Sequence, residues 1–426
     1  MRNARLLVAC VALLAACSTS GSVKAPLPAA PASTAGIRSN PGGPDLERYT
    51  NNAGQYPRAT PSTWWQAAYS VDAFSRMDEI FSARVVRRGD SASVWKRAPT
   101  EPSIRYQVPQ SRGGGQYDLD GYLSRNPTTG LLVAVGDTIQ IERYQYARTE
   151  THRLVSFSMA KTICALLVGL AVSDGAIASI EDPAETYVPA LKGSEYGRTP
   201  IRHLLTMSSG VRFREEYDSN DDVAKMSSAI LFGPGGAGAV RQFNTREVAP
   251  GQRWYYASAE SEVLGLVLTG ALKRPIGDYL SERIWRPIGA EADASWVIDR
   301  TGQETTYANF SAVLRDYGRL GLLLANGGRV GDRQVIPAAW LREMTRPHFS
   351  GSQTGRWYGY GFQTWIFPDN DGSFALLGVR GQTIFVDPAR KLVMVHTAVR
   401  PDYRDTGGAE TTALWRSLRQ HFPRRG

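Results

Sequence analysis

The chain has 426 residues, of which 42% are hydrophobic and 10% aromatic, enough for one large core or for one core with an inserted lobe. Its formal net charge of +9 reflects 49 Lys and Arg against 40 Asp and Glu. The basic residues are spread out, without a long run or an aromatic-interleaved cluster, so we expect no nucleic-acid partner. With three cysteines, at positions 10, 17 and 164, the chain offers no disulfide framework.

The N-terminus has the features of a secretory signal. "MRNARLLVACVALLAAC" opens with two arginines and continues with an apolar stretch that is too short to span a bilayer as a helix. Its last four residues, ending at Cys17, resemble the bacterial lipobox. We expect a signal peptide over 1–16, lipidation of Cys17 and a disordered Ser/Pro/Ala-rich tether over 17–44. The alternative is an ordinary signal peptide with Cys17 present by chance.

This resemblance implies a lipid-anchored protein of the bacterial cell envelope, on the outer membrane or the periplasmic face. The membrane would be contacted only through the acyl chains on Cys17. Ser18, rather than aspartate, follows the cysteine and resembles outer-membrane sorting.

The next segments predict an N-terminal extension over 45–116 and a main domain over 117–426. Within the extension, "VDAFSRMDEIFSARVV" (71–86) predicts a helix. The main domain opens with "YDLDGYLSR", a short predicted helix. "GLLVAVGDTIQIERYQYA" (130–147) then predicts a hairpin of two strands that turns at Gly-Asp.

"SFSMAKTICALLVGL" (156–170) places Ser158 three residues before Lys161 at the start of an apolar helix, which ends at Asp174-Gly175. Only seven lysines occur in the chain, so this one requires a local reason. Positions three apart share a helix face, and apolar surroundings disfavour the charged amine, which makes Lys161 a candidate base for Ser158. Alternatively, Ser158 caps a core helix and Lys161 reaches solvent. A second Ser-x-x-Lys string, Ser93 to Lys96, lies in a polar segment and is interpreted as incidental.

Three further strings follow in chain order: "IRHLLTMSSGV" (201–211), "YASAESEVLG" (256–265) and "GVRGQTIFVDPAR" (378–390). The second places Tyr256 and Ser258 before another apolar helix. The third lies in "FALLGVRGQTIFVDPARKLVMVHTA" (374–398), which predicts two strands joined by the turn "DPAR". Loops between the Ser158 and Tyr256 segments are expected to line a cleft, with Tyr217 as a candidate substrate contact.

Together these strings resemble the serine β-lactamase and D-alanyl-D-alanine peptidase superfamily, and most closely its class C-like branch of esterases and 6-aminohexanoate-dimer hydrolases. The resemblance implies an α+β fold: an antiparallel β-sheet covered by helices, with an inserted mostly helical lobe. It also implies that Ser158 is the acylated nucleophile, Lys161 its base and Tyr256 a proton relay. On this view, the positive charge of Lys161 holds down the pKa of the Tyr256 phenol.

Two departures from the family pattern concern substrate binding. Ser258 stands where the Tyr-x-Asn element has asparagine, and Val379-Arg380-Gly381 stands where Lys-Thr-Gly is usual. Both argue against efficient β-lactam hydrolysis. The resemblance implies that the backbone N–H of Gln382 completes an oxyanion hole with that of Ser158. Arg380 is either a clamp for a substrate carboxylate or a solvated edge-strand arginine.

We therefore expect an envelope-tethered serine hydrolase that cleaves a small-molecule or peptide ester or amide through an acyl-enzyme. No cofactor is expected, and the five histidines lack paired metal-ligand spacing. The absence of a Gly-x-Ser-x-Gly string argues against an α/β-hydrolase. The alternative function is a catalytically weak protein of this fold that binds a peptide or cell-wall fragment. The sequence leaves the oligomeric state open.

Overall fold

The computed structural model of the protein describes residues 37–402 and 407–424. The predicted signal peptide, Cys17 and most of the predicted tether lie outside the described residues. The end of that tether, residues 37–44, does not match the prediction of disorder: strand β1 (Arg38–Ser39) runs parallel to β7, and the Asn40 N–H donates to the Tyr144 carbonyl at 2.9 Å. Backbone pairing therefore orders this segment, and the tether prediction is wrong there.

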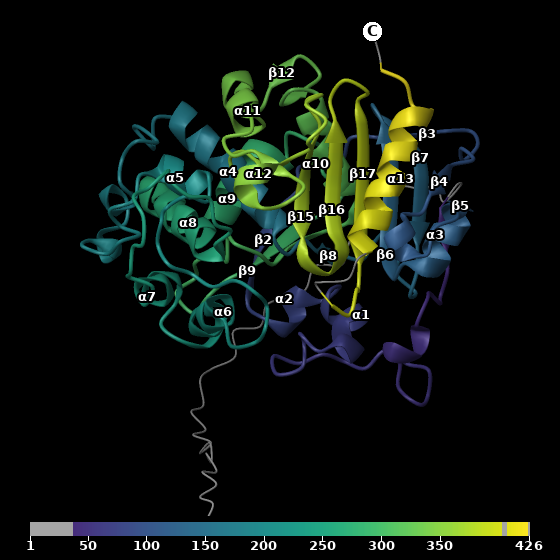
Figure 1. Ribbon diagram of the computed structural model, residues 1–426, viewed down its shortest axis with the longest axis horizontal. Coiled ribbons are helices and arrows are strands. Elements are labelled where there is room, and N and C mark those ends of the chain that lie inside the picture. The colour runs from purple at the N-terminus through teal and green to yellow at the C-terminus, as the bar shows by residue number, and fades with distance from the viewer. Residues whose placement is uncertain (1–36, 403–406, 425–426) are drawn as a thin grey trace, which may run out of the picture. The chain divides into compact units, whose positions relative to one another are not determined.

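A nine-stranded sheet forms the framework of the described chain (Figure 1). Its order is β1-β7-β6-β17-β16-β15-β14-β13, with β3 also on β7. All neighbours are antiparallel except β1 and β3, which both run parallel to β7. The strands are β3 (Lys96–Arg97), β6 (Thr128–Val135), β7 (Thr138–Tyr144), β13 (Gly359–Tyr360), β14 (Trp365–Ile366), β15 (Phe374–Gly378), β16 (Gln382–Asp387) and β17 (Leu392–Ala398).

Smaller sheets complete the strand set. A four-stranded sheet has the order β2-β9-β10-β8, and two hairpins pair β4 with β5 and β11 with β12. Their bounds are β2 (Ala83–Val86), β4 (Arg105–Gln107), β5 (Gln116–Asp118), β8 (Leu154–Val155), β9 (Ala294–Val297), β10 (Phe310–Ala312), β11 (Arg329–Val330) and β12 (Arg333–Gln334).

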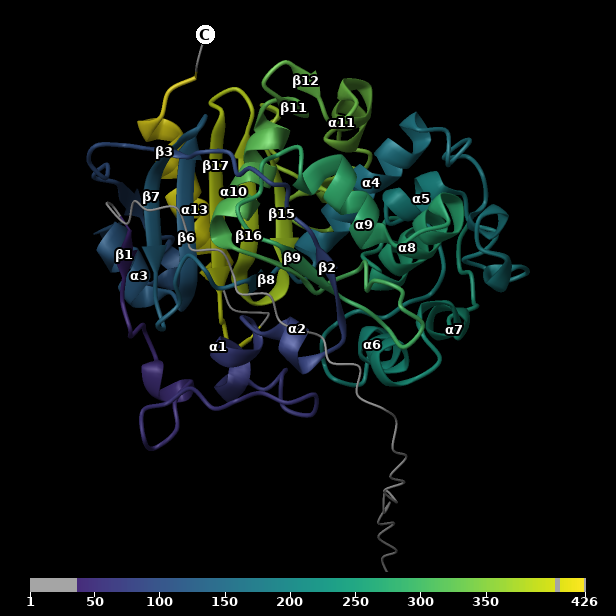
Figure 2. The ribbon, with the colours of Figure 1, turned by 180° about the vertical axis from the view of Figure 1, so that it is seen from behind.

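Helices cover both faces of the large sheet and form a lobe beside its β15 side (Figures 1 and 2). They are α1 (Ser70–Ala73), α2 (Met77–Ile80), α3 (Leu119–Arg125), α4 (Met159–Ser173), α5 (Ile201–Leu205), α6 (Asp222–Phe232), α7 (Gly236–Arg241), α8 (Ser258–Leu272), α9 (Ile276–Leu280), α10 (Leu314–Ala325), α11 (Ala338–Met344), α12 (Gly351–Thr354) and α13 (Gly407–His421). Within the two described ranges, none of the helices combines the length and apolar character that a membrane span requires.

Successive side chains of the central strands enter different cores, as the twofold periodicity of a strand dictates. On β6, Leu132 and Ala134 lie in the core that also contains α4, α8 and α10. Leu131 and Val133 lie in a second core, which α13 closes with Leu414 and Trp415. Both faces are therefore buried, which explains why β6 is apolar throughout.

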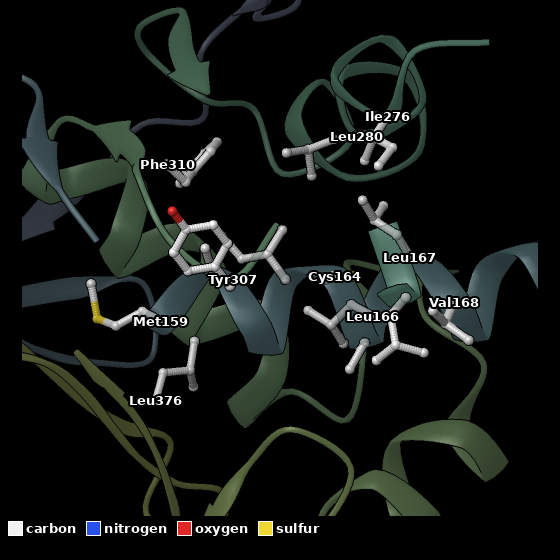
Figure 3. Close-up of a cluster of buried hydrophobic side chains, with 14 of the residues drawn as sticks. Met159, Cys164, Leu166, Leu167, Val168, Ile276, Leu280, Tyr307, Phe310 and Leu376 are labelled. Carbon is white, nitrogen blue, oxygen red and sulfur yellow. The ribbon is translucent and has the colours of Figure 1, made fainter. Parts of the chain in front are cut away.

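Helix α4 is buried on all sides. Every residue from Met159 to Ala171 is buried, as expected for a helix that is apolar around its whole circumference. Figure 3 shows its side chains meeting Ile276 and Leu280 of α9, Phe310 of β10 and Leu376 of β15. The helix that begins directly after Ser158 is thus fixed by several elements at once.

The other predicted elements have mixed outcomes. The 130–147 hairpin is confirmed, with Val135 paired to Thr138 across the turn. The 374–398 segment has three strands rather than two, because the chain also turns between Gly378 and Gln382, where Arg380 and Gly381 have positive φ values. The predicted helix over 71–86 is wrong: α1 and α2 are single turns, and Ala83–Val86 is strand β2, paired with β9.

Candidate active site

Ser158 occupies the turn that opens α4. Its backbone is helical, and its side chain makes no capping hydrogen bond, so Oγ remains available. Phe157, directly before it, has a φ of +42°, which is unusual for an aromatic residue. The Phe157 ring packs edge-on against Phe74 and Trp65, with centroids 4.8 and 5.6 Å away. The N-terminal extension therefore helps to hold the backbone that presents Ser158.

Lys161 points at Ser158 from within the same helix. Its Nζ lies 3.1 Å from Ser158 Oγ, 3.0 Å from Ser258 Oγ and 2.6 Å from the Tyr307 carbonyl oxygen. The side chain is only 1% exposed. Burial lowers the pKa of Lys161 to about 8, although the negative charges of Glu215 and Glu262 oppose this shift. A substantial neutral fraction is therefore available near pH 8 to accept a proton from Ser158.

Tyr256 reaches the same point from the segment before α8. Its hydroxyl hydrogen-bonds with Ser158, and Lys161 Nζ lies 5.2 Å from the centroid of its ring. Trp365 stacks on the ring at 5.4 Å, and Tyr360 packs against its edge. Two parts of the chain about a hundred residues apart thus converge on Ser158 Oγ.

The pKa of the Tyr256 phenol is shifted in the direction opposite to the one expected from the sequence. Burial and the charge of Glu215 raise the pKa of Tyr256 above its ordinary value, while the Ser158 hydrogen bond and Arg356 lower it only in part. The expectation that Lys161 holds this pKa down is wrong, because the lysine is itself buried and titrates more readily. Tyr256 is therefore a protonated phenol that can donate, not a phenolate.

Ser258 and Tyr217 are joined by a residue that the sequence did not single out. Ser258 Oγ donates to Glu215 Oε1 at 2.7 Å, and the Ser258 N–H donates to Oε2 at 2.6 Å. The Tyr217 hydroxyl donates to the same Oε1 at 2.6 Å. Glu215 is buried beside the exposed Glu216, and nothing in the acidic string "REEYDSNDD" marks which carboxylate turns inward.

Arg380 does not face the Ser158 cluster. Its guanidinium lies 4.4 Å from the Trp65 ring centroid, and it donates to the backbone carbonyls of Trp65 and Pro401, each at 3.0 Å. The side chain is buried, so a solvated edge-strand arginine is wrong. Its donors point into the protein, so the observed geometry offers no clamp for a substrate carboxylate.

The side chain of Gln382 is buried and hydrogen-bonds with the backbone of β17. Its side-chain amide donates to the carbonyl of Ala398 at 2.8 Å and accepts from the N–H of the same residue at 3.2 Å. The end of the preceding strand packs closely against the segment before Ser158: a Cβ on Gly378 would lie 2.3 Å from the Ser156 carbonyl oxygen. Val379 is the residue of this turn that lines the cavity beside Ser158. The expected oxyanion-hole donor is the backbone N–H of Gln382, which does not depend on this side chain and stays a prediction.

That cavity has a volume of about 290 Å³. Ser158, Ser258, Tyr217, Tyr307 and Val379 belong to its wall. The extension adds Trp64 and Trp65, and α6 adds further apolar side chains. Two larger depressions, of about 540 and 500 Å³, include Arg143 and contain none of the predicted site residues. A third, of about 510 Å³, adjoins the cavity at Phe232 and includes Lys225, which is paired with Asp222 at 3.1 Å. In the part of the chain that the structure describes, no three His, Cys, Asp or Glu side chains are grouped to hold a metal ion.

Comparisons with known proteins identify the family and the fold. Residues 119–414 match the family model described as Beta-lactamase. The 6-aminohexanoate-dimer hydrolase of Paenarthrobacter ureafaciens is 26% identical over 375 residues, which are 83% of this chain and 91% of that protein.

Two solved structures share the fold. A Bacillus anthracis protein provisionally assigned as a 6-aminohexanoate-dimer hydrolase superposes with a TM-score of 0.76 at 23% identity, covering 89% of this chain and 98% of that one. A family VIII carboxylesterase has a TM-score of 0.54 at 19% identity, covering 70% and 94% of the two chains. The family match and these superpositions confirm the predicted fold class and superfamily.

Proposed function

We propose that this chain, which belongs to the beta-lactamase family, is a serine hydrolase that cleaves an ester or amide through an acyl-enzyme on Ser158. Relatives named as a 6-aminohexanoate-dimer hydrolase and a carboxylesterase support a hydrolase of this type. The observation that carries the proposal is the 3.1 Å contact between Ser158 Oγ and a buried Lys161 whose pKa is about 8, next to a cavity.

In the proposed acylation, Lys161 Nζ accepts the Ser158 hydroxyl proton as Oγ bonds to the substrate carbonyl carbon. The carbonyl oxygen becomes an oxyanion beside the Ser158 N–H, at the positive end of α4, with the backbone N–H of Gln382 as the second proposed donor. Collapse breaks the bond to the leaving nitrogen or oxygen. Tyr256 donates its proton to that atom and recovers one from Lys161. Water then releases the acid by the same steps in reverse.

Glu215 has a positioning role in this scheme. It binds the N–H and Oγ of Ser258, and Ser258 Oγ in turn accepts from Lys161. Ser258 is thereby a support for the base. The side-chain amide that the asparagine of the Tyr-x-Asn element would offer a β-lactam is absent. We therefore expect ester cleavage to be readily measured and β-lactam turnover to be weak.

The test is covalent labelling of Ser158. An alkyl fluorophosphonate should label the wild type, and Ser158→Ala should abolish both labelling and p-nitrophenyl ester cleavage. Ser93→Ala is the matched control, since Ser93 begins the second Ser-x-x-Lys string, in which Lys96 is exposed and paired with Asp137. Labelling that survives in Ser158→Ala refutes the assigned nucleophile. A wild type that is neither labelled nor active on esters and amides favours the binding-protein alternative.

A further inference from the structure

The cavity beside Ser158 lacks a partner for a charged substrate group. Among the described residues that line it, none is Arg, Lys or His, and the one acidic residue is Asp221. The Asp221 carboxylate is fully buried and accepts from the backbone N–H groups of Glu216, Tyr217 and Ala224, at 2.7, 2.5 and 2.9 Å. Its oxygens are therefore already engaged with the turn that precedes α6.

Aromatic side chains form a continuous path from Ser158 to the surface. The Trp65 ring packs edge-on to that of Phe157, Trp64 lies 5.1 Å from Trp65, and Phe81 lies 5.6 Å from Trp64. Phe232, at the end of α6, lies 6.3 Å from Phe81 and is 55% exposed. Trp64, Trp65 and Phe232 all line the cavity. A large exposed aromatic residue at the mouth of a cavity is available to contact a ligand.

The proposed mechanism puts the acyl group of the substrate in this cavity. Tyr256, the proposed proton donor to the leaving group, does not line it, whereas Ser158 and Val379 do. The leaving group is therefore expected on the Tyr256 side, which leaves the cavity for the acyl group. An apolar acyl chain gains by leaving water here. A carboxylate or ammonium at its end would lose hydration without finding an opposite charge.

We propose that this cavity selects esters or amides with an uncharged, apolar acyl group, and that Trp64, Trp65 and Phe232 set that selectivity. The inference rests on the proposed function, because it takes Ser158 as the acylated residue. It gives the N-terminal extension a direct role in substrate choice. It also predicts that a charged acyl chain, such as a 6-aminohexanoyl group, is a poor substrate even though a relative bears the name of such a compound.

The test compares acyl groups that differ in length or in terminal charge on one leaving group. We expect kcat/KM for p-nitrophenyl hexanoate to exceed that for the acetate by about tenfold or more, because the longer chain removes more methylene groups from water. It should also exceed that for the p-nitrophenyl monoester of adipate and for the 6-trimethylammoniohexanoate ester by at least about tenfold. Equal or faster turnover of either charged ester would overturn the proposal.

Variants at the mouth of the cavity sharpen the test. Phe232→Lys supplies a cation, so the preference for hexanoate over the adipate monoester should fall by about tenfold, and Trp65→Ala should reduce the preference for hexanoate over acetate. Trp357→Ala is the control, because Trp357 is 40% exposed but lies outside the cavity; both ratios should stay at the wild-type value. Unchanged ratios in Phe232→Lys contradict the assignment of this wall.

The labelling and ester experiments distinguish an error in the cavity selectivity from an error in the hydrolase assignment. If the fluorophosphonate labels Ser158 but the ester ratios do not follow the cavity, the selectivity proposal is wrong and the hydrolase proposal stands. If Ser158 is not labelled and no ester turnover depends on it, the proposed function itself is wrong.

Discussion

Lys161 combines two properties that favour a base: deep burial and direct contact with Ser158 Oγ. With a pKa of about 8, the amine is mostly protonated at pH 6 and mostly neutral at pH 9. Since only the neutral amine accepts the Ser158 proton, kcat/KM should rise with pH through a midpoint near 8. Stopped-flow cleavage of a p-nitrophenyl ester across this range measures the midpoint. A profile that is flat from about pH 6 to 9 would contradict this role for Lys161.

Glu215 should set the position of that midpoint. Its negative charge raises the pKa of Lys161, so Glu215→Gln, which keeps the shape, should move the acid limb of kcat/KM to lower pH. The measurement is the same pH profile. Glu216→Gln is the matched control, because Glu216 is adjacent but exposed and is expected to leave the midpoint in place. If Glu215→Gln lowers kcat without moving the midpoint, Glu215 acts only through packing.

Contacts within one helix could be predicted from the sequence, whereas contacts between distant segments could not, because they depend on the folded chain. The proximity of Ser158 and Lys161 follows from helix geometry alone. Tyr256 was expected there only because the surrounding string resembles a family motif. Glu215 lies 43 residues from Ser258, and only the folded loop brings its carboxylate to that serine. Arg380 was placed near the substrate by its position in a motif, but its side-chain direction depends on the turn between β15 and β16.

At the scale of elements, α8 carries a cost that should appear in the stability of the protein. Burial raises the pKa of Glu260 to about 8, and one of its carboxyl oxygens has no hydrogen-bond partner. The folded state therefore holds this proton up to about pH 8, whereas an unfolded glutamate releases it above about pH 4.5. The folded state binds more protons between these values, so the free energy of unfolding should fall as pH rises, by up to about 1.4 kcal/mol per pH unit for this group.

Urea unfolding between pH 5 and 8 measures this slope. Glu260→Gln should flatten it, because the substitution removes the titrating group and retains an acceptor for the Ser209 hydroxyl. Glu262, also buried with its pKa raised to about 8, should leave a residual slope. Glu282→Gln, at a partly exposed position, is the control. Parallel pH curves for Glu260→Gln and wild type would show that Glu260 is already ionised in the folded state.

Long helices and strands with one regular hydrophobic pattern could be predicted from the sequence, whereas short elements could not. Helix α4 and the β6–β7 hairpin match their predictions, because a continuous apolar run and a Gly-Asp turn define them locally. The segment 71–86 has a helix-like pattern, yet its last part pairs with β9, more than two hundred residues away. That pairing is a tertiary effect, which local propensity does not contain.

At the scale of the whole described chain, the N-terminal extension is part of the hydrolase fold. Strand β3 of the extension joins the large sheet beside β7, and β2 joins the smaller sheet. Trp65 reaches the cavity beside Ser158, and Arg380 binds its backbone carbonyl and stacks on its ring. The extension is predicted as a region outside the hydrolase domain because its pattern matches no family string, whereas its Trp64 and Trp65 form part of the cavity wall beside Ser158.

Arg380 connects the N-terminal extension to the β15–β16 turn, so its substitution should test whether the extension stabilises the cavity wall. It links the β15–β16 turn to the Trp65 carbonyl and to Pro401, so Arg380→Ala removes a charged donor shared by three chain segments. We expect a loss of about 2 kcal/mol in the free energy of unfolding. We also expect faster amide hydrogen exchange in residues 60–75 specifically, because that segment loses its anchor. Alanine keeps the Cβ, so the strain of the positive φ at this position remains.

Arg390→Ala provides the comparison that isolates this effect. Arg390 lies at the opposite end of β16, where its guanidinium donates to Asp387 and to the Arg419 carbonyl, both outside the extension. Its loss should destabilise the fold without selectively releasing 60–75. If exchange in 60–75 rises equally in both variants, the extension responds to global stability alone. If it rises only in Arg380→Ala, and the preference for hexanoate over acetate falls with it, one buried guanidinium connects the extension to the selectivity of the cavity.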